Sequence, residues 1–258
     1  MSLPLKIIPI QLLEEYKTAF NANIKAAFEN LQDSELSIEN FSFYTSVSAV
    51  FSSKIEGEDI DLDSFIKHKR FGINYKPDYT QKIDDLYNAY EFAKSNRLSA
   101  DTLMEAHTLL TKNILHTSEQ GKFRNSNMYV MTDDGRIEYV AATPESVTTE
   151  MSKFYQDLES ILKTEIAFEE IFFFAAMLHL VFVKIHPLSD GNGRTARLLE
   201  KWFLAEKLGK KAWFIESERN YYNHHKIYYN NLRALGLEYE TLDYSKALPF
   251  LRMLAASL

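Results

Sequence analysis

Cysteine is absent from this chain of 258 residues, and glycine and proline are scarce, with 8 and 6 residues. The lack of cysteine excludes disulfide frameworks, thiolate metal sites and cysteine nucleophiles. Glycine and proline are the residues that most often interrupt regular structure. Their scarcity in a chain of this length therefore favours long helices over a many-stranded sheet.

An excess of positive charge is also missing, since the formal net charge is -7 at pH 7. Wrapping nucleic acid requires a broad basic face, so we expect no direct nucleic-acid binding. Hydrophobic residues make up 46% and charged residues 25% of the chain, which is ordinary for a soluble globular protein.

No hydrophobic run has the length of a membrane span. The most apolar segment, residues 171–185, is shorter than the roughly 20 apolar residues a span needs, and it contains His179 and Lys184. We expect it to be a buried core helix, and we expect no membrane partner. The N-terminal segment MSLPLKIIPI lacks the basic region, apolar stretch and cleavage site of a secretory signal.

Apolar residues at helical spacing predict a mainly helical, all-α fold with one small β-hairpin. The expected helices span residues 10–31, 42–55, 81–94, 99–115, 144–162, 167–185, 194–208, 220–235 and 244–258. Two β-prone runs, residues 128–131 and 137–140, flank an Asp-Gly pair, which is a hairpin signal.

The organisation of the chain is expected to be simple, without internal repeats or low-complexity tracts. Residues 71–79, FGINYKPDY, are the best candidate for a change between an N-terminal helical region and the rest. We divide the chain into an N-terminal helical region, residues 1–98, and a core with C-terminal helices, residues 99–258.

The strongest chemical signal is residues 186–197, HPLSDGNGRTAR. Pro187 disfavours helical geometry at His186, so the preceding helix is expected to end there. Gly191 and Gly193 make the following loop tight and let its backbone approach a ligand closely.

A second helix is expected to begin near Arg194, with Asn192 or Gly193 as its cap. The free N–H groups and positive dipole end of such a helix favour an anion. Arg194 and Arg197 lie three residues apart and therefore share a face. Two guanidinium groups in that position can fork onto phosphate oxygens.

Two further side chains of the loop carry chemistry. Asp190 lies beside the predicted anion site, and Mg²⁺ is often held by one carboxylate together with phosphates and water. His186 is a candidate general base. The helix C-terminus favours its protonated form, so another group must offset this effect, and the sequence does not identify that group.

Two other readings of the glycine loop are weaker. Gly191, Gly193 and Ala196 fit the dinucleotide-binding pattern, but that pattern requires a strand and a βαβ unit, and the rest of the chain does not alternate strands and helices. A phosphate-binding P-loop is excluded, because no Gly-Lys-[Ser/Thr] ends the run.

The whole constellation resembles the motif of the Fic family, His-Pro-Phe-x-[Asp/Glu]-Gly-Asn-Gly-Arg-x-x-Arg. The matching positions are His186, Pro187, Asp190, Gly191, Asn192, Gly193, Arg194 and Arg197. Leu188 stands where the family usually has Phe, at a packing position. Eight matches at fixed spacing make this a highly specific signal.

The resemblance extends over roughly residues 100–235. Glu105–His107 resembles part of the family's first core helix, and Gly121–Arg124 with the hairpin resembles the flap along which a target chain docks as an added strand, here at Val130 and Met131. Tyr228 and Tyr229 resemble the aromatic pair that lines the family's adenosine pocket.

A second motif lies upstream. Ser52 to Gly57, SSKIEG, resembles the family's inhibitory motif [Ser/Thr]-x-x-x-Glu-[Gly/Asn]. Ser52 and Glu56 are four residues apart and share a helix face, and Gly57 can end that helix. The resemblance implies that Glu56 pairs with Arg197 and denies it to the γ-phosphate, which would put the chain in the class with an N-terminal inhibitory helix.

The resemblance implies a protein adenylyltransferase, which transfers AMP from Mg-ATP to a Ser, Thr or Tyr hydroxyl of a protein. His186 would be the base, Asp190 the magnesium ligand, and Asn192 and Arg194 would stabilise the transferring phosphate. The nucleotide would contact Gly191, Gly193, Arg197, Tyr228 and Tyr229 as well. A cytoplasmic location and a homodimer also fit the family.

Related activities remain open at this point. The same fold can transfer UMP, phosphocholine or a phosphoryl group, or remove AMP. Phosphoryl-transferring relatives usually have Lys at the position of Gly193. A non-enzymatic binding or regulatory module is the alternative from a different class, and the presence of His186, Asp190 and both arginines argues against it.

Overall fold

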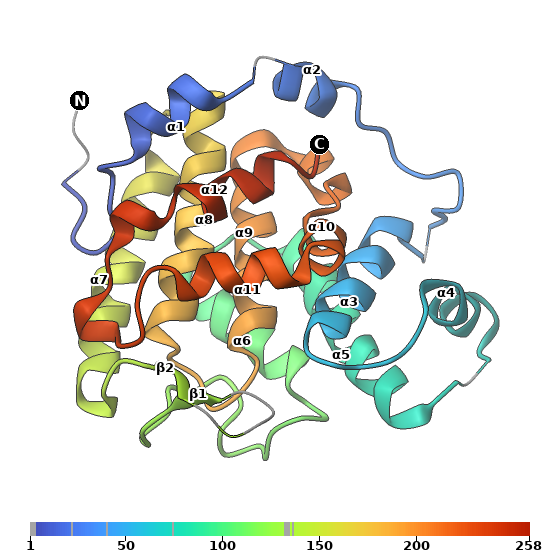
Figure 1. Cartoon of the computed structure of the whole chain (residues 1–258). Coiled ribbons are helices and arrows are strands. Elements are labelled where there is room, and N and C mark those ends of the chain that lie inside the picture. Colours follow the sequence, from blue (N-terminus) through green and yellow to red (C-terminus); the bar gives the residue numbers. More distant parts are fainter. Residues whose placement is uncertain (1–3, 22, 40, 74, 132–134, 136) are drawn as a thin grey trace.

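The computed structural model describes residues 4–21, 23–39, 41–73, 75–131, 135 and 137–258. Within these residues the molecule is mostly helical, with one two-stranded antiparallel sheet at the lower edge of Figure 1. The predicted fold class, helical with a single small hairpin, is therefore confirmed.

The elements follow one another along the chain from blue to red in Figure 1. They are α1 (Leu13–Ala19), α2 (Asn23–Glu29), α3 (Phe43–Ile55), α4 (Leu62–Phe71), α5 (Pro77–Ser95), α6 (Ala100–Leu110), β1 (Tyr129–Met131), β2 (Ile137–Val140), α7 (Pro144–Lys163), α8 (Phe168–Ile185), α9 (Asn192–Leu208), η1 (Lys210–Phe214), α10 (Ser217–Asn223), α11 (His225–Arg233), η2 (Tyr239–Thr241), η3 (Tyr244–Lys246) and α12 (Leu248–Ala255).

Helices α8 and α9 form the centre of the molecule and pack against each other. Helix α8 has apolar residues on all sides, a pattern typical of a helix that is fully buried. Helices α1, α7, α9 and α12 contact it. Phe172, Phe173 and Phe182 are fully buried in it, and each is worth about 1.5–3 kcal/mol relative to exposure. This packing makes α8 a rigid support for the residues at its carboxyl end.

Helix α3 packs against α5, α9 and α10 with an unusually polar surface. Its buried residues include Ser46, Ser48, Ser52 and Ser53. Small hydroxyl side chains allow close approach, and two of them bond to α9: Ser48 Oγ accepts from Lys201, and Ser52 Oγ accepts from Arg197. The N-terminal region is thus joined to the central helix by hydrogen bonds.

The hairpin lies beside the carboxyl end of α8 (Figure 1). Tyr129 pairs with Val140 and Val130 with Tyr139, with an irregularity before Met131. The predicted turn at residues 132–136 lies, except for Gly135, outside the described residues. Strand β2 is also joined to the segment after α11, because Val140 N donates to Leu237 O at 2.8 Å.

Several predicted boundaries were wrong. The helix expected at residues 10–31 is two helices, with Asn21 Oδ1 accepting from Asn23 N at the break. The helix expected at 220–235 is divided at His224, whose backbone leaves the helical region at φ -111°. Helix α4 was not predicted, and α6 ends at Leu110 rather than at 115.

The cap of α9 also differs from the prediction. Helix α9 begins at Asn192 with Gly191 as its cap, not with Asn192 or Gly193. The proposed division into residues 1–98 and 99–258 falls between α5 and α6, which pack against each other.

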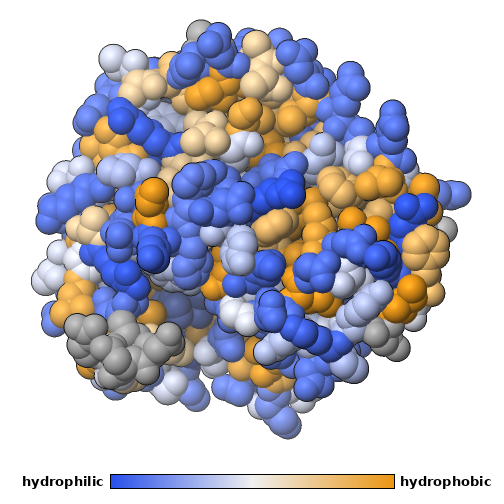
Figure 2. Space-filling model, turned by 45° about the vertical axis from the view of Figure 1, so that its right-hand side comes forward, coloured by the Kyte–Doolittle hydropathy of each residue, from blue (hydrophilic) through white to orange (hydrophobic). Residues whose placement is uncertain are grey.

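Among the described residues no helix is long and apolar enough to cross a membrane. Figure 2 shows hydrophilic residues over most of one face, with smaller hydrophobic patches between them.

Candidate active site

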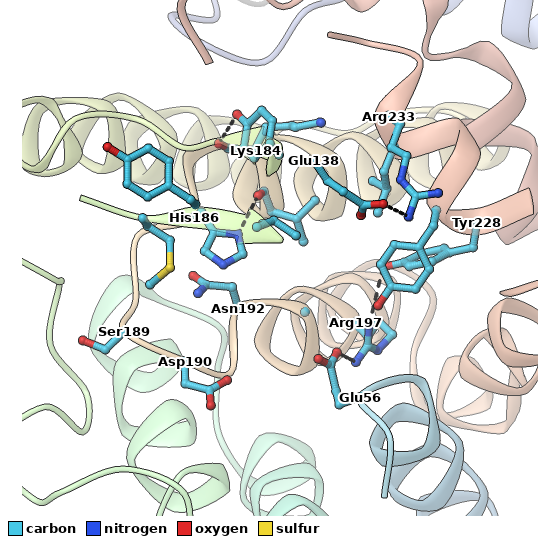
Figure 3. Close-up of a pocket in the computed structure, with 18 residues that line it drawn as sticks. Glu56, Glu138, Lys184, His186, Ser189, Asp190, Asn192, Arg197, Tyr228 and Arg233 are labelled. Atoms are coloured by element: carbon cyan, nitrogen blue, oxygen red, sulfur yellow. Dashed lines mark hydrogen bonds and ion pairs between the residues drawn. The ribbon is translucent and has the colours of Figure 1, made fainter. Parts of the chain in front are cut away.

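A cavity of about 320 Å³ lies between the carboxyl end of α8, the start of α9, the hairpin and α11. Figure 3 shows its lining residues. Those predicted from the sequence to form the site and found in the lining are Glu56, Val130, His186, Asp190, Asn192, Gly193, Arg197, Tyr228 and Tyr229. Ser52, Met131, Gly191 and Arg194 do not line it.

His186 is the residue that ends α8. Its backbone is left-handed, at φ 53° and ψ 57°, because Pro187 cannot continue the helix. The ring Nδ1 lies 3.2 Å from Val183 O. A carbonyl oxygen only accepts, so Nδ1 carries the proton and Nε2 is left with a lone pair.

The environment of His186 keeps the imidazole neutral. Loss of solvent lowers the pKa of His186 to about 4, and the positive charge of Arg124 acts in the same direction. The hydrogen bond to Val183 O and the charges of Glu56 and Asp190 oppose this shift. Burial and Arg124 therefore oppose the protonation that a helix C-terminus favours.

The loop between the two helices is held by its own side chains and by α6. Asn192 Oδ1 accepts from Leu188 N at 2.9 Å, and Asn192 Nδ2 donates to Leu188 O at 2.8 Å. Leu188 is fully buried. One N–H of the Asn192 amide therefore shapes the loop, and its second N–H is not used by these bonds.

His107 of α6 is a supporting residue under the loop. Its Nδ1 accepts from Gly121 N at 2.9 Å, so Nε2 carries the proton and donates to Asp190 O at 3.0 Å. His107 is fully buried, and burial lowers its pKa. The position of Asp190 is thus fixed through its backbone, while its side chain is 49% exposed.

Arg197 and Glu56 form an ion pair inside the cavity (Figure 3). Arg197 Nη2 lies 2.5 Å from Glu56 Oε1, and its Nε donates to Ser52 Oγ at 2.9 Å. Burial raises the pKa of Glu56, but the charges of Arg197 and Arg194 outweigh it and the pKa is lowered overall. Glu56 is therefore ionised at neutral pH and occupies the donor face of Arg197.

Gly193 allows Glu56 to come this close. A Cβ atom at Gly193 would lie 2.6 Å from Glu56 Oε1 and 3.1 Å from Arg197 Nη1. The glycine leaves the first turn of α9 open, and the carboxylate lies directly over it. An anion at a helix N-terminus is favourable, so the dipole of α9 stabilises Glu56 as well.

Arg194 pairs with a carboxylate that was not predicted from the sequence. Its Nη1 lies 3.3 Å from Glu58 Oε1, and both side chains are buried, at 5% and 6% exposure. Glu58 also lies 3.8 Å from Lys82 Nζ. Burial raises the pKa of Glu58, with Arg194 and Lys82 opposing. Its place two residues beyond Glu56 is the signal that could have identified it.

The wall on the α11 side contains a buried hydrogen-bonded chain. Tyr228 OH lies 3.0 Å from His179 Nε2 and accepts from Arg197 Nη1 at 3.5 Å, and His179 Nδ1 lies 2.8 Å from Glu200 Oε2. Burial raises the pKa of Tyr228 to about 12, so it stays a neutral hydroxyl. Tyr228 is 1% exposed, and its hydroxyl contacts both Arg197 and His179.

The opposite wall is the hairpin. Val130 lines the cavity, whereas Met131 is 56% exposed and is not part of the lining. Within the described residues β1 pairs only with β2, which leaves its outer edge available to another strand. Glu138 of β2 and Arg233 of α11 form an ion pair of 2.6 Å that joins the hairpin to the α11 wall.

The side chains of the cavity suit a metal ion that is bound partly by a ligand's phosphate oxygens and not by protein groups alone. Among the described residues no group of three or more His, Asp or Glu side chains could hold a metal ion. Asp190 offers a single, half-exposed carboxylate to the cavity. One carboxylate is the protein contribution that Mg²⁺ commonly has when phosphate oxygens complete its shell, so Asp190 fits that ion.

Comparisons with known proteins identify relatives of this chain. Residues 97–204 match the model of the Fic/DOC family. Protein adenylyltransferase Fic of Nematostella vectensis is 31% identical over 112 residues, 43% of this chain and 24% of that protein. Protein adenylyltransferase fic-1 of Caenorhabditis briggsae is 35% identical over 104 residues, 40% of this chain and 18% of that protein. The chain thus spans a quarter or less of the length of these relatives.

Solved structures show the same fold. A Fic family protein from Desulfovibrio desulfuricans G20 has a TM-score of 0.71 at 20% identity, and the match covers 100% of this chain and 74% of that one. Fic-1 from C. elegans has a TM-score of 0.67 at 20% identity, covering 95% of this chain and 68% of that one. The resemblance to the Fic family is confirmed.

Proposed function

We propose that this chain, which belongs to the Fic/DOC family through residues 97–204, transfers AMP from ATP to a hydroxyl of a protein. The relatives named protein adenylyltransferase support this activity. The observation that carries the proposal is the position of His186, whose Nδ1 is bonded to Val183 O, in the same cavity as Gly193 in the first turn of α9 and Arg197.

The start of α9 would bind the phosphates of ATP. The N–H groups of its first turn have no partner within the helix and lie at the positive end of its dipole. Gly193 leaves room for a phosphate to approach them, as it does for Glu56. Arg197 would hold the terminal phosphate in the place that Glu56 occupies here, and the second N–H of Asn192 would hold the α-phosphate.

His186 would then act as the base. Its Nε2 takes the proton of the target hydroxyl, the hydroxyl oxygen attacks the α-phosphorus, and the bond from the α-phosphorus to the bridging oxygen breaks. Pyrophosphate leaves and AMP stays on the target. A Mg²⁺ ion at Asp190, when bound, would neutralise charge on the phosphates. The N–H groups of the loop stabilise the charge that grows on the α-phosphate.

The target would lie against the hairpin. The free edge of β1 can accept an extended segment as an added strand, and the exposed Tyr129 and Met131 flank it. Because Val130 and His186 line the same cavity, such a strand would pass near the imidazole and could present a Ser, Thr or Tyr hydroxyl to Nε2.

Glu56 would restrain the enzyme. Its carboxylate pairs with Arg197 and lies over Gly193, so it competes with the outermost phosphate of ATP for the same donors. Binding ATP in the productive orientation requires Glu56 to leave. We expect the activity of the unmodified chain to be low.

The test measures AMP transfer with ATP labelled at the α-phosphate, using the chain itself and a host lysate as targets. Glu56→Gly is expected to raise labelling at least tenfold, because Arg197 becomes free to bind phosphate. Glu35→Gly, at an exposed loop position, is the control and should change nothing. Equal labelling of the wild type and Glu56→Gly contradicts the restraint.

The role of His186 is tested in the Glu56→Gly background. His186→Ala should lower labelling by about 100-fold or more, the range of a lost general base, with ATP affinity kept. His116→Ala, an exposed histidine, is the matched control. Mass spectrometry of the modified residue must find an added AMP, and a different group would refute AMP as the transferred moiety.

A further inference from the structure

A buried guanidinium closes the carboxyl end of α8, and the chemistry proposed above does not use it. Arg124, in the loop between α6 and the hairpin, is 4% exposed. Its Nε donates to His186 O at 2.7 Å, and its Nη2 donates to Ile185 O at 3.5 Å. The backbone N of the same residue donates to Pro187 O at 2.9 Å. Arg124 therefore binds three consecutive carbonyls at the point where α8 ends.

These carbonyls need an outside partner. The last carbonyls of a helix have no N–H partner within it and form the negative end of its dipole. Among the described residues no carboxylate lies within ion-pair distance of Arg124, so its charge faces this helix end rather than an acidic side chain. The Arg124 guanidinium donates to these carbonyls and offsets the negative end of the helix dipole. A protonated His186 is therefore not needed for that purpose.

The same guanidinium also binds both ends of the hairpin. Its Nη1 donates to Ser126 O at 2.6 Å, before β1, and its Nη2 donates to Ala142 O, after β2. A planar guanidinium carries five N–H donors in a fixed arrangement, so bonds to the hairpin and to α8 are made by one rigid group. A lysine has the charge but cannot reproduce these directions.

The backbone of His186 depends on this support. A left-handed conformation is unfavourable for residues other than glycine, and His186 adopts it at φ 53°. Arg124 Nε fixes the direction of the His186 carbonyl, and Val183 O receives the ring N–H. The two bonds together determine where Nε2 points.

Several charges surround the imidazole and act in opposite senses. Glu56, at the end of α3, and Asp190, in the loop before α9, favour its protonated form. Arg124 opposes it, and Lys184 and Arg197 line the same cavity. Arg124 is thus a cation bonded directly to the backbone of the proposed base.

We infer that Arg124 is a positioning residue that caps α8, holds His186 in its left-handed conformation and ties the base to both ends of the target-docking hairpin. This inference rests on the proposed AMP transfer and deepens it. The target strand and the base are then held by a single side chain, so the geometry of attack depends on the guanidinium fork and not on charge alone.

The experiment compares Arg124→Lys and Arg124→Met in the Glu56→Gly background. Both are expected to lower kcat at least tenfold with little change in ATP affinity, because the lost bonds orient the base and the hairpin. The acidic limb of the pH–rate profile should move to higher pH in Arg124→Met, and much less in Arg124→Lys, which keeps the charge. Arg97→Met, whose side chain is 94% exposed, is the control.

Two outcomes overturn the inference. One is unchanged kcat in both variants. The other is a loss of thermal stability with an unmoved pH profile and parallel loss of ATP binding, which would indicate a merely structural role. Arg124→Lys keeps the cation at the helix end and provides a folded comparison if Arg124→Met does not fold.

A separate readout distinguishes this inference from the proposed function. NMR titration of the His186 ring measures its pKa without any turnover. An upward shift in Arg124→Met supports the contact even if Glu56→Gly itself transfers no AMP, in which case the proposed function alone fails. An unchanged ring titration together with unchanged ring chemical shifts refutes the positioning role.

Discussion

At the scale of single residues, both arginines of the α9 start are bound by carboxylates from the N-terminal region. Glu56 pairs with Arg197 and Glu58 pairs with Arg194. Among the described residues Glu58 Oε2 and Arg194 Nε have no hydrogen-bond partner, so this second pair is imperfectly satisfied for a buried contact. An unsatisfied buried polar atom costs about 1–3 kcal/mol, which makes the pair easier to exchange for a ligand.

Glu58→Gln tests whether the second carboxylate also restrains activity. In the Glu56→Gly background, removing the charge of Glu58 should release Arg194 and raise AMP transfer a further several-fold. In the wild type the effect should be small, because Glu56 still occupies Arg197. Labelling by ATP in both backgrounds measures it, with the exposed neighbour Asp59→Asn as control. A decrease in the Glu56→Gly background would mean that Glu58 supports Arg194 rather than restraining it.

At the scale of elements, α3 is joined to α9 by a repeated polar contact. Ser48 and Ser52 are one helical turn apart on α3 and bond to Lys201 and Arg197, which are one turn apart on α9. Lys201 also pairs with Glu218 of α10, and both are fully buried. The register of α3 on α9 is thereby determined, and with it the position of Glu56 over Gly193.

Lys201→Met tests this polar contact between α3 and α9. It leaves Glu218 as a buried carboxylate without its cation, and removing one partner of a buried pair costs about 3–5 kcal/mol. Urea unfolding should show that loss, whereas Lys67→Met, which breaks the exposed pair with Asp63, should cost less than about 1 kcal/mol. The double variant Lys201→Met with Glu218→Gln should recover part of the stability. No recovery would show that Lys201 acts through packing and not through charge.

At the scale of the whole molecule, the protonation of His186 and Glu56 changes the free energy of unfolding as well as the charge of the site. The folded pKa of His186 is about 4, below the ordinary 6.5, so between these values the unfolded chain binds more protons than the folded chain. Folding stability then rises with pH through this window. The lowered pKa of Glu56 acts in the same sense below the ordinary carboxyl value of 4.5.

His186→Gln isolates the contribution of the histidine. The difference in free energy of unfolding between this variant and the parent should favour the variant increasingly as pH falls from 6.5 to about 4, and be constant above pH 7. Urea titrations at a series of pH values measure it. A difference that is independent of pH would mean that His186 titrates normally in the folded chain.

The sequence by itself determined the features that are written within a few neighbouring residues. The apolar run at 171–185 predicted α8 because a helix covered on all sides must be apolar all round. The twelve residues from His186 to Arg197 predicted an anion site because proline, glycine and arginine act locally on backbone and charge. The hairpin followed from an Asp-Gly pair between β-prone runs, and the family resemblance followed from fixed spacing.

Only the tertiary structure decided which distant groups meet these local features. Arg124 lies 62 residues before His186, and Glu58 lies 136 residues before Arg194. Contacts at such separations leave no periodicity in the sequence, because they depend on how whole helices pack. The neutral state of His186 is of the same kind, since the loss of solvent that lowers its pKa arises only when the chain has folded around the ring.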